Sequence, residues 1–330
     1  MNERNTDNKS LMVTIRCLTY NHEPYIRQCL EGFVMQKSNF KFEAIVHDDA
    51  STDGTAAIIR EFAEKYPDII KPIFETENQY SKHDGSLNRI MNEHTHGKYV
   101  AYCEGDDYWT DPLKLQKQID FLESHPDYGA VYTDFDGYVQ ETGERKDMHI
   151  VPKNGWVYED MLCGKLDIWT LTVCVRAEFV LNGLNVHDDD IFKGDRLLFL
   201  YITSLTKVHC LYEKTAVYRI LKQSASHFID LSEAIKFQYI ISNVHRYFLM
   251  HGPEVSKQIR QYVLRYSGSR RIRYAYIFRR QDVLINTEYP FNVIKSLKDF
   301  ICYLLYKAGQ YNCIFKLIAI SVRFQNRRIG

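Results

Sequence analysis

The chain has 330 residues, of which 45% are hydrophobic and 25% are charged, a composition that fits a globular protein with one large domain or two. Its 42 Lys and Arg residues balance 42 Asp and Glu residues. The formal net charge of zero excludes a general attraction to nucleic acid, so we expect no nucleic-acid partner.

The sequence shows no pattern typical of export or of a membrane span. No uncharged apolar stretch reaches about 18 residues. The first ten residues, MNERNTDNKS, are polar, so we expect a disordered leader over residues 1–10. The eight cysteines form no C-x-x-C pair and lie mostly in apolar runs, which is typical of buried thiols in a reducing cytoplasm. We therefore expect a cytoplasmic location.

Apolar strands and helices alternate over the first hundred residues. The runs MVTIRCLTY (12–20), FEAIVHDD (42–49) and YVAYC (99–103) have the composition of buried strands. Helical spacing follows the first run near residues 26–33, and follows the second run over TAAIIREFAEKY (55–66). This order predicts an α/β fold with a mostly parallel, doubly wound sheet flanked by helices.

Polar side chains follow three of the predicted strands at the points where the strands end. The first strand ends in Thr19-Tyr20-Asn21, the second in Asp48-Asp49, and the third in the segment 104–107, Glu-Gly-Asp-Asp. The carboxyl ends of parallel strands meet at one edge of a sheet, where ligands gather. The sequence therefore predicts a binding site at this edge.

The segment 104–107 places three carboxylates within four residues. In an extended chain, Glu104 and Asp106 point the same way, and Gly105 between them allows close approach of another group. Such a group of oxygen ligands suits Mg²⁺ or Mn²⁺. The alternative is a solvated acidic turn, in which Asp111 caps the following helix.

The second part of the chain contains further strands and then helices. We expect a helix over 113–126, a strand or hairpin over 128–140, a strand over 171–176, a loop that becomes a helix over 192–205, and two short strands over 208–220. From Leu231 onward the pattern is helical. Apolar and basic residues are interleaved over 292–325, so a helix there either lies on an anionic membrane surface or packs on the rest of the protein.

Three stretches carry a resemblance to a known family. The stretches VTIRCLTYNHEPYIRQCLEGFVMQ, FEAIVHDDASTDGT and GKYVAYCEGDDYW closely resemble the nucleotide-binding half of the family 2 glycosyltransferases. These are inverting enzymes of the GT-A fold, with a Rossmann-like, mostly parallel sheet. The match covers residues 11–135, and a weaker match to the acceptor half continues over 136–228. The resemblance implies a GT-A catalytic domain over 11–228. The helical pattern that follows predicts a helical C-terminal region over 229–330, which carries no part of the resemblance.

The resemblance also implies which residues bind the donor. In the family, the first two strand ends hold the uridine of a UDP-sugar, which makes Thr19, Tyr20 and Asp48 candidates for nucleoside contacts. Asn21 and Asp49 belong to the same strand ends, where Asp49 is also expected to shape the turn. The remaining donor-binding candidates are Arg89, Glu104, Asp107, Trp109 and Arg219. For Arg89 the alternative is a solvated helix face, and for Trp109 it is a packing anchor.

The metal motif of the family is commonly Asp-x-Asp, and here its first position is Glu104. Asp106 is therefore the preferred metal ligand. Asp107 is a further candidate ligand. In the alternative, Asp107 and Glu104 contact the sugar hydroxyls or the water ligands of the ion. His227, in the segment that closes over the donor in relatives, is the third candidate.

An inverting transfer needs one general base to take the proton of the acceptor hydroxyl. Asp195, in the motif KGDRLL, matches the family position of this base. The nearby run 188–190, Asp-Asp-Asp, competes for the role, although such a run is usually a solvated surface.

The resemblance implies a transferase of the hexosyl or N-acetylhexosaminyl type that uses a divalent metal. Its donor would be a nucleotide-sugar, UDP-linked, and its acceptor a saccharide or a lipid-linked sugar in surface polysaccharide synthesis. Peripheral contact with the inner membrane would come from the C-terminal basic and apolar helices. The alternative is a non-catalytic nucleotide-sugar binding protein with the same fold. A nucleotidyltransferase fits less well, because residues 21–24, Asn-His-Glu-Pro, are not its glycine-rich and basic loop.

Overall fold

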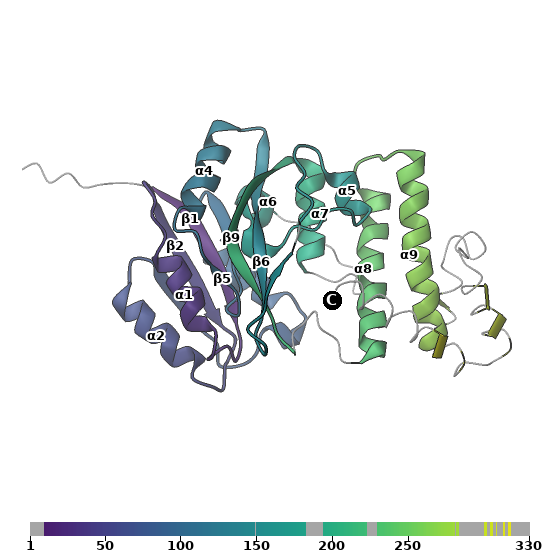
Figure 1. Cartoon of the computed structure of the whole chain (residues 1–330), viewed down its shortest axis with the longest axis horizontal. Helices are drawn as coiled ribbons and strands as arrows, with labels where there is room; N and C mark the ends of the chain where they lie inside the picture. The colour runs from purple at the N-terminus through teal and green to yellow at the C-terminus, as the bar shows by residue number, and fades with distance from the viewer. Residues whose placement is uncertain are drawn as a thin grey trace, which may run out of the picture. The chain divides into compact units, whose positions relative to one another are not determined.

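The computed structural model describes residues 10–148, 150–182, 194–222, 230–280 and 282–283, and eight single residues between 300 and 317. The chain forms two compact units (Figure 1). The first comprises Met1–Val157, Leu166–Leu184 and Leu205–Lys222, and the second comprises Tyr158–Lys165, Asn185–Ser204 and Gln223–Gly330. The predicted domain boundaries at residues 135 and 228 stay predictions.

One mixed sheet forms the centre of the first unit. Its strands are β1 (Leu11–Thr19), β2 (Lys41–Asp48), β3 (Ile70–Phe74), β4 (Tyr99–Tyr102), β5 (Tyr108–Trp109), β6 (Tyr128–Val139), β7 (Arg145–Asp147), β8 (Cys174–Arg176) and β9 (Lys207–Ile220). The order is β3-β2-β1-β4-β8-β6-β9-β5, and β7 pairs with β6. β1, β2, β3, β4, β6 and β9 share one direction, while β5, β7 and β8 run against them. The prediction of a mostly parallel sheet is confirmed.

Helices cover this sheet. They are α1 (Ile26–Val34), α2 (Thr55–Lys65), α3 (Ser86–Glu93), α4 (Lys114–Ser124) and the short α6 (Glu178–Leu181), with two 3₁₀ turns, η1 (Tyr80–Lys82) and η2 (Thr170–Thr172). The apolar spacing of α1 turns Ile26, Leu30 and Phe33 into a fully buried core with Ile15 and Val46 of the central strands. This packing fixes the positions of β1 and β2, and with them the place where the two strands end.

The register of the central strands brings their ends together. Thr19, the last residue of β1, is the register partner of Asp48, the last residue of β2. After β4 the chain continues beside β1, because the amide of Gly105 donates to the carbonyl oxygen of Leu18 over 2.9 Å. The acidic loop, which we define as residues 104–107, therefore lies beside the end of β1.

The structure differs from the predicted strands at two places. One strand, β9, replaces the two short strands expected over 208–220, because it pairs along β6 with local shifts of register near Asp134 that keep it continuous. Only residues 174–176 of the expected strand over 171–176 are a strand. The residues just before them form η2, where the Thr172 amide donates to the carbonyl of Trp169.

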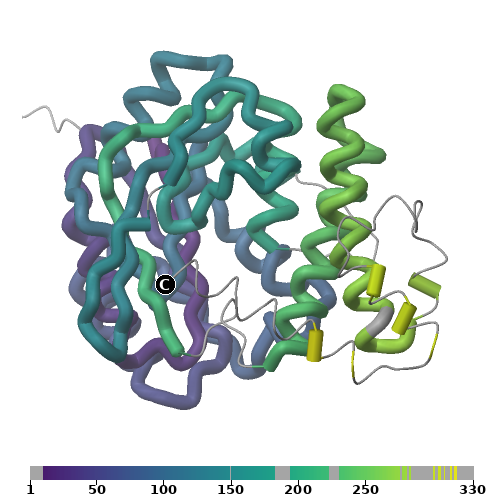
Figure 2. The backbone as a smooth tube through the Cα atoms, turned by 45° about the vertical axis from the view of Figure 1, so that its right-hand side comes forward, coloured from purple at the N-terminus to yellow at the C-terminus, as the bar shows by residue number. Residues whose placement is uncertain are grey.

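The second unit is helical. It contains α5 (Tyr158–Leu162), nearly all of α7 (Asp195–Leu205), α8 (Leu231–His251) and α9 (Lys257–Ile277). α8 and α9 lie side by side as a hairpin (Figures 1 and 2). The side chains of Asp230 and Ser256 cap their first turns. The helical pattern predicted from Leu231 is thus observed in these two helices, and no helix in the described part of the chain has the length and apolar character needed to cross a membrane.

Candidate active site

The ends of β1 and β2 carry two enclosed polar atoms that make no hydrogen bond to any described residue. They are the hydroxyl oxygen of Thr19 and Oδ1 of Asp48, whose residues are 2% and 3% exposed. Buried polar atoms are normally hydrogen-bonded, because leaving one unsatisfied costs about 1–3 kcal/mol. Two such atoms on register partners indicate a place built for a ligand rather than for local structure. Tyr20, the next residue, has 46% of its surface exposed and is available for stacking.

The other polar residues of these strand ends hold the neighbouring turns. The Asp49 carboxylate accepts the amides of Gln79 and Tyr80 over 2.6 and 3.0 Å. Asn21, at a positive φ of 55°, accepts the amide of Thr52 with its side-chain oxygen over 2.8 Å. Asp49 therefore shapes the turn before α3, as expected, and Asn21 joins two loops at the same edge.

The three carboxylates of the acidic loop have different surroundings. Asp107 is 3% exposed, and its Oδ1 accepts the main-chain amide of Arg219 over 2.7 Å. Glu104 is half-buried, and its Oε2 accepts the hydroxyl of Thr170 on η2 over 2.8 Å. Asp106, also half-buried, lies between them. Burial raises the pKa of Asp107 well above its ordinary value, and the negative charges of Asp106 and Glu104 raise it further.

Arg219 fastens the acidic loop from β9. Its Nε donates to the carbonyl oxygen of Asp106, and its two terminal nitrogens donate to the side chains of Gln140 and Gln28, all over 2.6–2.7 Å. The residue is 5% exposed, and three aromatic rings surround its guanidinium, those of Tyr25, Tyr108 and Tyr138. The predicted contact of Arg219 with a donor stays a prediction, while the observed contacts make it the anchor of the loop.

Crowded carboxylates fit a hard divalent cation, which would relieve their mutual repulsion. Glu104 and Asp106 offer oxygen atoms of the kind that Mg²⁺ and Mn²⁺ prefer. Among the described residues, no group of three His, Cys, Asp or Glu side chains is arranged to hold a metal ion. An ion at this loop would thus complete its coordination with water and phosphate oxygens.

Comparison with known proteins decides the family. The family model described as Glycosyl transferase family 2 matches residues 15–179, half of the chain. The chain belongs to glycosyltransferase family 2. The matched range contains the second half of β1, all of β2 and β4, and the acidic loop, so the elements that form the candidate site lie within the family match.

Two curated relatives match parts of this chain. An uncharacterized protein of Mycobacterium tuberculosis is 45% identical over 115 residues, which cover 35% of this chain and 32% of that protein. The putative teichuronic acid biosynthesis glycosyltransferase TuaG of Bacillus subtilis is 30% identical over 169 residues, which cover 51% of this chain and 63% of TuaG. The chain thus spans about a third of the length of the first relative and less than two thirds of the second.

The solved structures show the fold. S. aureus TarS 1-349 in complex with UDP-GlcNAc has a TM-score of 0.56 and 16% identity, covering 92% of this chain and 84% of that chain. Mannosyltransferase PcManGT from Pyrobaculum calidifontis, in complex with GDP-Man and Mn²⁺, has a TM-score of 0.55 and 16% identity, covering 96% of this chain and 87% of that chain. The predicted GT-A fold of this family 2 member is confirmed.

The remaining predicted residues of this family 2 member lie in several places. Trp109 is 2% exposed, donates through its indole N–H to the carbonyl of Leu171 over 2.9 Å, and meets Phe33 edge-on, which is the packing alternative; its predicted contact with a sugar stays a prediction. Arg89 is exposed and donates to the carbonyl of Asp84.

The predicted general base lies in the second unit. Asp195 is the first residue of α7, is exposed, and accepts the amide of Arg196 with its side chain over 2.7 Å. Its role stays a prediction. His227 and the competing run 188–190 lie outside the described residues.

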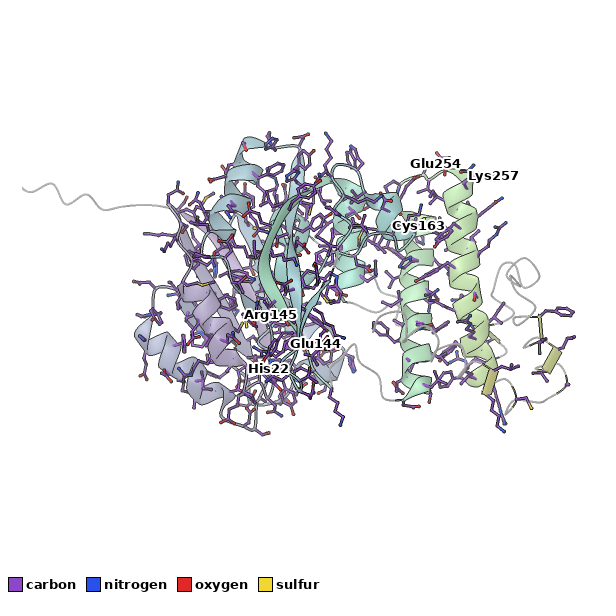
Figure 3. The ribbon with its side chains drawn as sticks, in the orientation of Figure 1. His22, Glu144, Arg145, Cys163, Glu254 and Lys257 are labelled. Atoms are coloured by element: carbon purple, nitrogen blue, oxygen red, sulfur yellow. The ribbon has the colours of Figure 1, made fainter. Side chains whose placement is uncertain are left out.

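One residue of the site was missed by the sequence analysis. His22, labelled in Figure 3, follows the end of β1 by three residues, and its buried Nδ1 makes no hydrogen bond to the described residues. The charges of Asp106, Asp53 and Asp48 all act on its imidazole. Its place in the polar turn 21–24 was visible, but nothing in the turn itself indicates that the ring points back under the acidic loop.

Proposed function

We propose that this chain transfers a sugar from a UDP-linked donor to a saccharide or lipid-linked acceptor, with inversion of configuration, in the synthesis of a surface polysaccharide. The observation that carries the proposal is the pair of unsatisfied buried atoms on Thr19 and Asp48, beside the carboxylates of the acidic loop. Family membership supports the reaction class. The name of TuaG supports a cell-surface polymer, and the UDP-GlcNAc bound to TarS supports a UDP-linked donor.

The nucleoside of the donor binds at the ends of β1 and β2. The Asp48 carboxylate accepts the ring N–H of uracil, and the exposed Tyr20 ring stacks on the base. The Thr19 hydroxyl, held at the same height by the register of β1 and β2, adds a further polar contact.

A bound Mg²⁺ or Mn²⁺, held by Asp106 and Glu104, would offset the negative charge that develops on the departing diphosphate. The chain itself keeps those two carboxylates in place. Arg219 fastens the main chain of Asp106, and Thr170 donates to Glu104.

The acceptor end of the reaction needs a base, and we assign that role to Asp195. Its carboxylate takes the proton from the acceptor hydroxyl as the oxygen of that group forms a bond to the anomeric carbon. The bond from that carbon to the diphosphate breaks on the opposite face, so the product has the inverted configuration.

We further propose that the protein works in the cytoplasm, at the cytoplasmic face of the inner membrane. The support is the interleaving of lysines with apolar residues over 292–325, a segment that lies largely outside the described residues. A soluble protein that remains entirely in the supernatant after centrifugation with anionic liposomes would contradict this part of the proposal.

A turnover assay tests the reaction. The purified protein is mixed with UDP-sugars, Mn²⁺ and saccharide acceptors, and released UDP is measured. Asp106→Ala should abolish release, Asp195→Asn should abolish transfer while UDP still binds, and the exposed control Asp120→Asn should behave like the parent protein. Full activity of Asp106→Ala or Asp195→Asn would contradict the mechanism. Binding of UDP-sugars without any turnover would favour the non-catalytic alternative.

A further inference from the structure

The main chain of His22 makes local hydrogen bonds, whereas its side chain takes no part in them. Its amide donates to the Thr55 hydroxyl over 2.8 Å, and its carbonyl oxygen accepts the amides of Tyr25 and Ile26 over 2.9 and 2.8 Å. These bonds fix the turn and the start of α1 whatever side chain stands at this position. The imidazole makes no hydrogen bond to the described residues, so local structure does not explain a histidine here.

Gly105 shows where the imidazole lies. A Cβ added to Gly105 would come within 2.9 Å of His22 Nδ1 and within 2.8 Å of the Thr19 hydroxyl oxygen. Both atoms are enclosed, and they face the same spot beneath the acidic loop. Because Nδ1 is enclosed, Nε2 is the ring nitrogen that a ligand can reach, and it can carry the imidazole proton.

The Nε2 edge is the open edge of the ring. His22 as a residue is only half-buried, and Nε2 is neither hydrogen-bonded nor among the enclosed atoms of the described residues. Burial lowers the pKa of His22, and the negative charges of Asp106, Asp53 and Asp48 oppose this effect. The ring sits among carboxylates that extend from the nucleoside end of the site, at Asp48, to the acidic loop.

A diphosphate offers only acceptor oxygens, and carboxylates cannot donate to them. The two arginines predicted at the site are engaged elsewhere. Arg219 donates from three nitrogens to Asp106, Gln140 and Gln28, and Arg89 donates to the carbonyl of Asp84. The open Nε2 edge of His22, on whose ring the charges of Asp48 and Asp106 both act, offers a donor group at this edge of the sheet.

We propose that His22 contacts the donor substrate, with its Nε2–H donating to a phosphate oxygen of the nucleotide diphosphate. The inference rests on the proposed function, because it presumes that a nucleotide diphosphate occupies this edge of the sheet. His22 then holds the diphosphate both before the sugar leaves and in the product complex, so its removal weakens binding of the nucleoside diphosphate itself.

Three substitutions separate the two ring nitrogens. His22→Gln places an amide nitrogen near the position of Nε2, His22→Asn places one near Nδ1, and His22→Ala removes both. His96→Gln is the matched control, because His96 lies in the same unit with 63% of its side chain exposed. Thermal unfolding of each variant checks that the fold is kept.

Calorimetric titration with UDP and with uridine, each in Mn²⁺ and in EDTA, provides the readout. We expect His22→Ala and His22→Asn to weaken UDP binding about ten- to a hundred-fold, the loss of one hydrogen bond to a charged group. His22→Gln should stay within about threefold, as should His96→Gln. Uridine, which lacks the diphosphate, should bind all five proteins equally.

Several results would overturn the inference. Equal UDP affinity in all the proteins would remove the contact. Equal losses for uridine and UDP would place the effect at the base, and a loss seen in Mn²⁺ but not in EDTA would place it at the metal. If the parent protein bound UDP while the variants were unaffected, only this inference would fail. If the parent protein did not bind UDP, the proposed function would fail with it.

Discussion

Gly105 is a residue of the candidate site whose surroundings leave no room for a side chain. A methyl group there would press on the Thr19 hydroxyl and on His22 Nδ1 at distances below 3.0 Å, which real Cβ atoms do not adopt. Both groups would have to move, and both belong to residues of the candidate site. The glycine in the acidic loop thus serves close approach, which the sequence analysis inferred from its position between Glu104 and Asp106.

We predict that Gly105→Ala weakens UDP binding at least tenfold while lowering the melting temperature by only a few degrees. The control is Gly155→Ala, where no atom lies within 4 Å but φ is +86°. That control should lose stability, about 1 kcal/mol, because alanine is strained at positive φ, and should bind UDP normally. Calorimetric titration and thermal unfolding of both variants separate binding from folding, and normal UDP affinity in Gly105→Ala would contradict the account.

The site at residue scale was only partly predictable. Thr19 and Asp48 could be predicted because parallel strand order alone brings their positions to one edge. His22 could not, because the direction of its ring depends on how the chain passes Gly105, which is a tertiary contact. The structural role of Trp109 was left open for a similar reason, since the partner of its indole N–H, Leu171, is far away in the sequence.

Among the elements, β9 is the strand that fastens the acidic loop. Arg219 near its end lies more than a hundred residues from Asp106 along the chain, yet it donates to the carbonyl of Asp106, and its amide donates to Asp107. This link is not visible in the sequence, which predicts two short strands over 208–220 and, by the family resemblance, a donor-binding role for Arg219. Only the pairing of β9 with β6 and β5 reveals where the guanidinium points.

We predict that Arg219→Lys destabilises the protein by about 3 kcal/mol, since a lysine cannot replace three directed donors inside an aromatic shell. Hydrogen exchange at residues 105–109 should accelerate. Arg27→Lys is the control, because Arg27 pairs with Glu61 at the surface with both side chains about half exposed, and such pairs contribute less than about 1 kcal/mol. Equal urea midpoints for the two variants would contradict the anchoring role.

A buried lysine joins α4 to η2. Lys114 is fully buried, and its Nζ donates to the carbonyl of Thr172 and to Gln118 over 2.9 and 3.1 Å, with the Trp109 ring 5.2 Å away. Burial lowers the pKa of Lys114 to about 7, against the opposing effect of Cys174, Cys103 and Asp111. In the unfolded chain the pKa is near the ordinary 10.5.

The difference between the pKa of Lys114 in the folded and in the unfolded state makes the stability of the protein depend on pH. Between pH 7 and pH 10.5 the unfolded state binds a proton that the folded state has released, so Lys114 makes the free energy of unfolding rise with pH. Replacing Lys114 with Met should remove this contribution and stabilise the protein most near pH 7. Urea unfolding at pH 7, 8 and 9 of Lys114→Met and of the exposed control Lys41→Met measures it. Parallel pH profiles for the two variants would contradict the assignment.

At the scale of the whole molecule, the two units differ in composition and in sensitivity to acid. The three tryptophans, Trp109, Trp156 and Trp169, all belong to the first unit, while α8 and α9 belong to the second. In the second unit His245 is 1% exposed, and its Nδ1–H donates to the carbonyl oxygen of Leu162 over 2.7 Å. Burial, together with the positive charges of Arg196 and Arg270, lowers the pKa of His245 to about 4, against the opposing effect of the hydrogen bond to Leu162.

The second unit should therefore lose stability in mild acid. Between about pH 6.5 and pH 4 the unfolded chain protonates His245 and the folded chain does not, so stability falls as pH falls. We predict a loss of far-UV helical signal near pH 4–5 before tryptophan fluorescence changes, and a shift of that loss to lower pH in His245→Gln. Coincident transitions by both probes, unchanged in the variant, would contradict this prediction.

The organisation of the chain into two units could also be predicted only in part. The alternation of strands and helices over the first hundred residues, and the helical pattern after Leu231, indicated an α/β part followed by helices. The assignment of Tyr158–Lys165 to the same compact unit as α8 and α9 could not be inferred, because it depends on contacts such as the Tyr158 hydroxyl donating to the carbonyl of Phe248. Local patterns carry no information about such distant partners.

The most direct test of the central claim is a calorimetric titration of UDP, in Mn²⁺, into the parent protein, Asp48→Asn and the control Asp230→Asn. Asp48 ends β2 with an unsatisfied buried oxygen, whereas Asp230 caps α8 in the other unit. We predict that the parent protein and Asp230→Asn bind UDP alike and that Asp48→Asn binds it at least tenfold more weakly. A parent protein that binds no nucleoside diphosphate, or an Asp48→Asn variant that binds UDP as tightly as the parent, would contradict the claim that this edge of the sheet is a nucleotide-sugar site.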